Sequence, residues 1–322
     1  MDKIVSAKRL LPSLFLFSLL AACGNDSEES ASSEELDTND EGTRVIEHAL
    51  GETEITDDIE KIVTLYQGAN DVAVALDVKP IGIVESWVEK PIYTYLNDEL
   101  EGAEIIGEET QPNLEAIAEL EPDLIIASRT RHEEIYEHLN DIAPTVVGDE
   151  VYDWKGTLDL MGRALNKEAE ADQLLEDYNV RISHFKEQMG DELPIEVAIT
   201  NFRADHARIF YMGFAGGILE DAGFTRPEGH DDSELWGIKL ASKESIPEAD
   251  AEVIFNFNSG TETEQIQQTY EEWTSHPLWK ELEAVKNDQV IMVDEVSWNS
   301  AGGYLSAHMV LDDLYDIFNV EE

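Results

Sequence analysis

Arginines are the residues of this sequence best suited to binding chemistry, because the chain carries few other cations. It has 71 Asp and Glu against 21 Lys and Arg, a formal net charge of −50. Four of the eight arginines that follow Cys23 lie in two short segments, Arg129 with Arg131 and Arg203 with Arg208. A guanidinium group stays charged at physiological pH and recognises carboxylates through paired hydrogen bonds. These segments predict contacts to an anionic group; the alternative is that each arginine pairs with one of the many acids.

Aromatic side chains form the second group of candidate binding residues. Five of them follow predicted strands or the Arg203 segment, or lie in a predicted loop: Trp87, Tyr211, Phe214, Trp236 and Trp298. An indole or phenol beside a strand end can stack on a flat or apolar part of a ligand. The alternative for each of them is core packing. Trp273 and Trp279, on a helical stretch, are predicted to be ordinary core or surface residues.

The elements that position these residues alternate between short β-rich runs and helical patterns from residue 45 onward. This alternation predicts parallel sheets covered by helices. The arginine segments follow strand runs directly, at the sheet edge where open α/β folds bind ligands. The predicted strands are 61–65, 81–84, 123–127, 145–147, 196–199, 252–255 and 290–293, and the predicted helices are 69–76, 113–120, 133–139, 216–222 and 301–318.

Residues 155–190 separate the two halves and contain no strand-like run. Their apolar residues recur at helical spacing, with a possible break at Gly162 and Asn166, and about 20 residues after that break would make a rod near 30 Å long. We therefore predict an α/β fold of two Rossmann-like lobes, mainly parallel sheets flanked by helices, joined by one long helix with a ligand cleft between the lobes. The predicted segments are an N-terminal lobe at 45–153, a linking helix region at 154–191 and a C-terminal lobe at 192–322. The alternative is a single doubly wound sheet with a long surface helix.

The N-terminus has the pattern of a secretory signal. A basic start and the apolar run 10–20 precede Leu-Ala-Ala-Cys at 20–23, which resembles the bacterial lipobox, where the cysteine is lipidated. We expect a signal peptide at 1–22 and lipidation at Cys23. An acidic flexible tether is expected at 23–44, because this stretch is too polar to order itself. The alternative is an ordinary signal peptide in which the cysteine is incidental.

Composition and missing motifs argue against several classes of protein. Hydrophobic residues make up 42% of the chain, enough for real cores, and a single cysteine cannot form a disulfide framework. Such an acidic surface repels phosphate backbones, so we expect no nucleic-acid partner. The chain has no G-x-S-x-G, P-loop or H-E-x-x-H motif, and its eight histidines show no metal-ligand pairing. We expect a monomer without enzymatic activity or cofactor, whose acidity reflects a salty or alkaline habitat more than steering of a cationic ligand.

Three blocks in the folded part form a family pattern. They are QPNLEAI with LEPDLII at 111–126, SKESI with AEVIF at 242–255, and PLWKEL with AVK and DQV at 277–290. In this order behind a lipobox, they resemble the substrate-binding lipoproteins of the ferric-siderophore and cobalamin class of ABC importers. The resemblance covers roughly residues 45–320. Within the family the segments SRTRHE, NFRADHARI and SWNSAGG are most similar to the Gram-positive iron-siderophore branch.

This resemblance implies a role in iron transport outside the cytoplasmic membrane, with the chain anchored to its outer face through the lipid on Cys23. The chain would capture a ferric siderophore of hydroxamate–citrate or carboxylate type and deliver it to an ABC permease, on which Glu115 and Glu244 would dock, one from each lobe. The siderophore would hold the iron, so no metal ligand is expected in the protein. The residues expected to contact the ligand are Arg129, Arg131, Arg203, Arg208, Tyr211, Trp236, Trp298 and Trp87. Cobalamin or heme binding on the same fold, an extracytoplasmic enzyme and binding of a bare metal ion remain open as alternatives.

Overall fold

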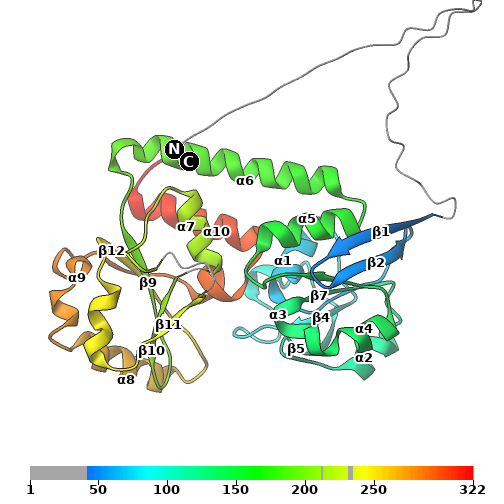
Figure 1. Ribbon diagram of the computed structural model, residues 1–322, viewed down its shortest axis with the longest axis horizontal. Coiled ribbons are helices and arrows are strands. Elements are labelled where there is room, and N and C mark those ends of the chain that lie inside the picture. The colour runs from blue at the N-terminus through cyan, green and yellow to red at the C-terminus, as the bar shows by residue number, and fades with distance from the viewer. Residues whose placement is uncertain (1–41, 212, 231–234, 322) are drawn as a thin grey trace, which may run out of the picture. The chain divides into compact units, whose positions relative to one another are not determined.

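The computed structural model describes residues 42–211, 213–230 and 235–321 (Figure 1). The predicted signal peptide, Cys23 and nearly all of the tether lie outside these residues. The predicted tether boundary is wrong by two residues, because strand β1 (Thr43–His48) begins inside it. Arg44 in β1 pairs with Asp57 at 2.6 Å and donates to the carbonyl of Ala164 at 2.7 Å, so this position already belongs to the fold.

The first lobe is built on a six-stranded sheet in the order β6-β5-β4-β3-β7-β8. All neighbouring strands are parallel except the short β6, which runs antiparallel to β5, and β1 pairs with β2 in a separate hairpin. Buried side chains pack on both faces of the sheet, as expected for parallel strands covered by helices. Its elements are β2 (Gly51–Thr56), β3 (Ile62–Thr64), α1 (Gln67–Ala75), β4 (Gly82–Glu85), β5 (Glu104–Glu108), β6 (Gln111–Pro112), α2 (Leu114–Leu120), β7 (Leu124–Ser128), α3 (Arg129–His132), α4 (Tyr136–Ile142) and β8 (Thr145–Gly148).

The second lobe has its own five-stranded sheet in the order β11-β10-β9-β12-β13. Strands β9, β12 and β13 are parallel, whereas β10 is antiparallel to both of its neighbours. Strands β10 and β11 were not predicted. Gly237 opens β11 at φ +153°, where a Cβ atom would lie 2.2 Å from the carbonyl oxygen of Ile209, so only glycine allows this close pairing. The elements are β9 (Val197–Phe202), β10 (Ala207–Phe210), α7 (Phe214–Asp221), β11 (Gly237–Lys239), β12 (Val253–Asn258), α8 (Thr263–Thr274), α9 (Glu283–Lys286) and β13 (Val290–Met292).

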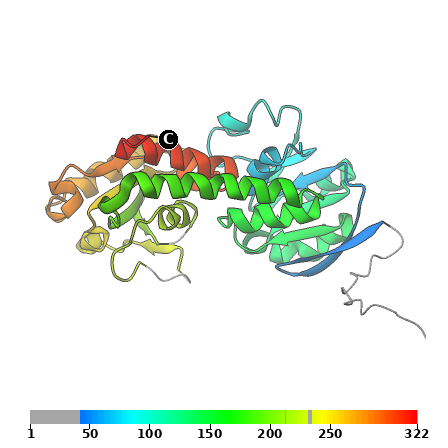
Figure 2. The ribbon, with the colours of Figure 1, turned by 90° about the horizontal axis from the view of Figure 1, so that it is seen from above.

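Helix α6 (Glu168–Met189) joins the two lobes. Its 22 residues make a rod of about 33 Å, which extends over both lobes beside α10 (Tyr304–Phe318) (Figures 1 and 2). The predicted break before it is confirmed at Asn166, which follows the end of α5 (Trp154–Ala164) and has a positive φ of 56°, whereas Gly162 lies inside α5. Two separate sheets joined by a long helix confirm the predicted fold class and exclude the single doubly wound sheet. Among the described helices, none combines the length and apolarity that crossing a membrane requires.

Two predicted helices begin three residues later than expected, whereas the other three begin within two residues of the predicted start. The helix predicted at 133–139 is preceded by α3, and a 3-10 turn, Glu133–Ile135, separates α3 from α4. The last helix begins at Tyr304 rather than at 301, because a π-helical turn, Val296–Ser300, comes before it. Trp273 and Trp279 are buried in the second lobe, so the prediction of a packing role is confirmed.

Asp71 in α1 connects the first lobe to the segment that returns from the second. Its fully buried carboxylate accepts the backbone N–H groups of Leu305 at 2.7 Å and Ser306 at 3.0 Å, in the first turn of α10. The hydroxyl of Tyr95 donates to it at 2.7 Å. Burial raises the pKa of Asp71 to about 6, and these hydrogen bonds oppose that shift. Asp71 therefore caps α10 from another element and fixes the chain that leads into it.

Candidate ligand-binding cleft

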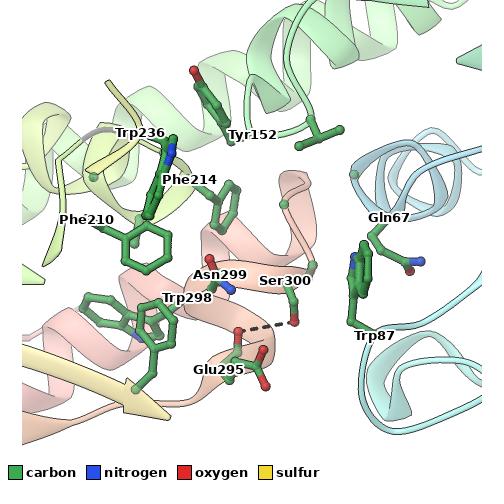
Figure 3. Close-up of a pocket in the computed structure, with 18 of the residues that line it drawn as sticks. Gln67, Trp87, Tyr152, Phe210, Phe214, Trp236, Glu295, Trp298, Asn299 and Ser300 are labelled. Atoms are coloured by element: carbon green, nitrogen blue, oxygen red, sulfur yellow. Dashed lines mark hydrogen bonds between the residues drawn. The ribbon is translucent and has the colours of Figure 1, made fainter. Parts of the chain in front are cut away.

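A cleft of about 510 Å³ lies between the two lobes (Figure 3). Its lining comes from the carboxyl ends of strands in both lobes and from the turn at 295–302 that precedes α10. This is the sheet edge at which the sequence predicted a ligand site. Charged side chains from both lobes meet in it, namely Glu109, Arg131, Arg203, Arg208 and Glu295.

Arg131 is held in place from the first lobe. Its Nε donates to Oε1 of Glu109 at 2.8 Å, and Glu109, with 3% of its surface exposed, also accepts the backbone N–H of Gln67 at 3.2 Å. His132 fixes the backbone of Glu109, because Ser128 N–H donates to its Nδ1 and its Nε2 then donates to the Glu109 carbonyl at 2.9 Å. Burial lowers the pKa of His132 to about 4, so the ring stays neutral. Within the described part of the chain, Glu109 is the one hydrogen-bond or ion-pair partner of the Arg131 guanidinium.

Arg203 and Arg208 bring two positive charges from the second lobe. Arg203 follows β9 directly and has no side-chain hydrogen bond or ion pair within residues 42–211, 213–230 and 235–321. The Nε of Arg208 donates to His206 at 2.7 Å, and its guanidinium lies 5.3 Å from the centre of the Trp236 ring. Burial and the charge of Arg203 both lower the pKa of Arg208. An anionic ligand would relieve this repulsion between the two guanidinium groups.

Two exposed indoles flank the cleft, one from each lobe. Trp87 follows β4 and is 40% exposed, and Trp236 precedes β11 and is 44% exposed. Figure 3 shows Trp236 above Phe210 and beside Phe214, with Trp87 on the other side of the cleft. Large apolar side chains this exposed are available to a ligand rather than used in a core. These positions agree with the predicted placement of Trp87 and Trp236, whereas Phe214 lines the cleft but is 5% exposed and packs in the core.

Two of the predicted contact residues lie elsewhere, and a third is buried in the cleft wall. Arg129 is not part of the cleft lining; its guanidinium pairs with Asp149, as the alternative interpretation had it. Tyr211 is 7% exposed, stacks on His230 with ring centres 4.4 Å apart and does not line the cleft. Trp298 reaches the cleft wall but is 1% exposed and packs in the core, where its indole N–H donates to a carboxylate of α10. We therefore correct the expectation for Arg129 and Tyr211 and treat Trp298 as a supporting residue.

Several lining residues were not found from the sequence. Phe210 and Phe257 extend the aromatic wall, and Asn299 adds an amide at the turn before α10. Glu109 and Glu295 place carboxylates among the arginines. Alternation along the short strand β10 could have indicated Phe210, but nothing distinguishes either glutamate among 71 acidic residues.

Glu295 is the carboxyl group whose protonation the cleft perturbs most. Burial raises the pKa of Glu295 to about 7, with a hydrogen bond from Ser259 and the charge of Arg203 opposing the shift and Asp294 adding to it. No ion pair within 4 Å joins Glu295 to Arg203, although both are among the described residues. Close to neutral pH this group therefore exists in both protonation states.

The two predicted docking residues lie on separate lobes and face solvent. Glu115 is exposed in the first turn of α2, beside the helix cap Asn113, which accepts the backbone N–H of Glu115 at 3.1 Å. Glu244 is exposed in the first turn of the 3-10 segment Lys243–Ala249, and a hydrogen bond from Ser242 lowers its pKa. Among the described residues, no group of three or more His, Cys, Asp and Glu could hold a metal ion.

The geometry agrees with the comparison to known families. A family model described as periplasmic binding protein matches residues 62–296, most of the folded part. The chain belongs to this family. Its members are solute-binding proteins, which agrees with a cleft between two lobes.

Individual members of the family resemble the chain over most of its length. The achromobactin-binding periplasmic protein of Dickeya dadantii is 43% identical over 260 residues, which cover 79% of this chain and 85% of that protein. The probable siderophore-binding lipoprotein YfiY of Bacillus subtilis is 38% identical over 324 residues, covering 97% and 98%. The crystal structure of Staphylococcus aureus SirA complexed with staphyloferrin B aligns with a TM-score of 0.84 at 46% identity, covering 87% of this chain and 99% of SirA. Family membership therefore rests on a family model and on relatives that cover most of the folded part.

Proposed function

We propose that this chain captures a ferric siderophore outside the cytoplasmic membrane and passes it to an ABC permease for iron uptake. The observation that carries the proposal is the cleft between the lobes, in which Arg131 faces Arg203 and Arg208 from opposite lobes. Three guanidinium groups on an otherwise strongly acidic protein suit a bulky chelate with carboxylate groups. The siderophore holds the iron, and the protein supplies charge, aromatic surface and enclosure.

The similar proteins support this ligand class. One reported relative is named for binding achromobactin and one for binding a siderophore, and SirA was crystallised in complex with staphyloferrin B. We propose a siderophore of carboxylate type because arginines line the cleft. We also propose that Trp87 and Trp236 contact the ligand from the two sides of the cleft. The lipid on Cys23 would keep the protein at the outer face of the membrane, near the permease.

Tryptophan fluorescence tests the binding step. The protein is titrated separately with ferric staphyloferrin B and ferric citrate, which carry carboxylate groups. Ferrioxamine B, which has none, serves as the comparison ligand. We expect saturable quenching by the carboxylate chelates, reduced in Trp87→Phe and Trp236→Phe because these indoles line the cleft. Trp273→Phe is the control, since this indole is buried in the second lobe away from the cleft. The proposal is wrong if none of the ferric chelates quenches the fluorescence and native mass spectrometry detects no complex.

Delivery to the permease is assigned to Glu115 and Glu244. Their placement, one exposed carboxylate on each lobe, would let a two-fold symmetric permease contact both lobes at once and sense their separation.

Iron uptake by cells tests this assignment. We expect the Glu115→Ala/Glu244→Ala double variant to lower uptake of the ferric chelate by about tenfold, a cost near 1.4 kcal/mol. Its affinity for the chelate should stay unchanged, because neither residue lines the cleft. The matched control is Glu119→Ala/Glu248→Ala, which removes two exposed acids from the same segments. Equal uptake by the two double variants would contradict the assignment.

A further inference from the structure

Glu295 has no evident purpose in a cleft that binds an anion. It lines the cleft together with Arg203 and Arg208, and an ionised carboxylate there cancels part of their charge. Figure 3 shows its carboxyl group below Ser300, on the side of the cleft that faces Trp87. A ligand filling the cleft would therefore come close to this group.

The second glutamate of the cleft is held differently. Glu109 accepts Nε of Arg131 at 2.8 Å and the backbone N–H of Gln67 at 3.2 Å, so two donors stabilise its carboxylate. For Glu295, the hydroxyl of Ser259 donates to the carboxylate, and no ion pair joins this group to any described cation. Of the two glutamates, Glu295 is therefore the one whose protonation state a bound ligand can change more easily.

The charged and titratable groups around Glu295 come from three elements. Arg203 faces it from the end of β9 and favours the ionised form, whereas Asp294 on its own segment disfavours that form. Tyr93, from the loop before the 3-10 turn Thr94–Leu96, interacts with Glu295 electrostatically, and burial raises the pKa of this phenol, so that it stays neutral. Burial has the largest effect on the pKa of Glu295, so near pH 7 the carboxyl group is partly protonated and partly ionised.

Resting on the proposed function, we propose that Glu295 takes up a proton from solvent when an anionic ferric chelate enters the cleft and hydrogen-bonds the chelate as a neutral acid. An incoming carboxylate would repel the ionised Glu295, while a protonated carboxyl group can donate to it. The proton returns to solvent when the chelate leaves. Glu295 thereby makes affinity for an anionic ligand depend on pH and is a specificity-determining residue of the cleft.

Titration calorimetry in buffers of different ionisation enthalpy measures the number of protons taken up when the chelate binds. For ferric staphyloferrin B at pH 7.5 we expect the wild type to take up roughly 0.5 to 0.8 proton per chelate bound. Glu295→Gln should take up close to none, because the amide is already neutral. The control Glu248→Gln removes one exposed acid of the same lobe outside the cleft and should behave as the wild type.

The pH profile gives a second readout. Wild-type affinity should fall by up to about 30-fold between pH 6 and pH 8.5, as the free carboxyl group becomes ionised. Glu295→Gln should keep most of its affinity over this range, and its profile corrects for titration of the chelate itself.

The outcomes separate this inference from the proposed function. Tight binding by the wild type without proton uptake, or equal uptake by Glu295→Gln, overturns the role of Glu295 and leaves siderophore capture intact. Failure of the wild type to bind any ferric chelate overturns both. The wild-type measurement of proton uptake still tests the inference if Glu295→Gln fails to fold.

Discussion

Replacing Arg203 with alanine is expected to weaken binding of ferric staphyloferrin B by about 100-fold, because a charged hydrogen-bond donor in a partly desolvated site contributes roughly 1.5 to 3 kcal/mol. Within the described part of the chain Arg203 is committed to no other hydrogen bond or ion pair, so its guanidinium is available to the ligand. Fluorescence titration or calorimetry gives the affinity.

Further variants separate charge from geometry. Arg203→Lys should recover part of the affinity, since an ammonium keeps the charge but loses the paired hydrogen bonds. Arg131→Ala should also weaken binding, and the Arg131→Ala/Arg203→Ala double variant should bind worst, because each lobe then lacks its cation. Arg163→Ala is the control, as this arginine pairs with Asp159 outside the cleft. If Arg131→Ala and Arg203→Ala both bind the chelate as tightly as Arg163→Ala, the two cleft arginines do not contribute to binding.

The placement of the arginines shows what a strand-end argument can and cannot predict. The sequence correctly placed Arg131 and Arg203 at the cleft, because both follow buried strands at the carboxyl edge of a sheet. It also selected Arg129, which lies two residues before Arg131 on α3. Residues two apart on a helix point about 200° away from each other, so one faces the cleft and the other faces Asp149.

The same limit applies to the aromatic residues and the acids. Tyr211 was predicted to contact ligand, but the structure places its neighbour Phe210 in the cleft and buries Tyr211 against His230. Successive side chains of an extended chain point to opposite sides, and the sequence did not reveal β10 or its register. Lobes, linking helix and sheet edge could be read from hydrophobic patterns. The functions of Glu109 and Glu295 depend on burial and on neighbours distant in sequence, which no local pattern encodes.

Asp71→Ala is expected to lower the free energy of unfolding by about 3 kcal/mol, the largest stability effect predicted here. The substitution leaves the N–H groups of Leu305 and Ser306 and the hydroxyl of Tyr95 without the acceptor that they share in a fully buried site. Urea denaturation measures the loss. The control Asp98→Ala removes an exposed acid and should change stability by less than about 0.5 kcal/mol.

A double-mutant cycle shows whether Asp71 acts through the cap of α10. Tyr95→Phe alone should cost about 1 kcal/mol, because it removes one donor and leaves the two backbone donors paired. Adding it to Asp71→Ala should cost little more, since the shared hydrogen bond is already gone. Additive losses would mean that the two residues act independently. Because the turn at 295–302 lies between β13 and the capped helix, Asp71→Ala should also weaken chelate binding, whereas a residue that merely fills the core would lower stability alone.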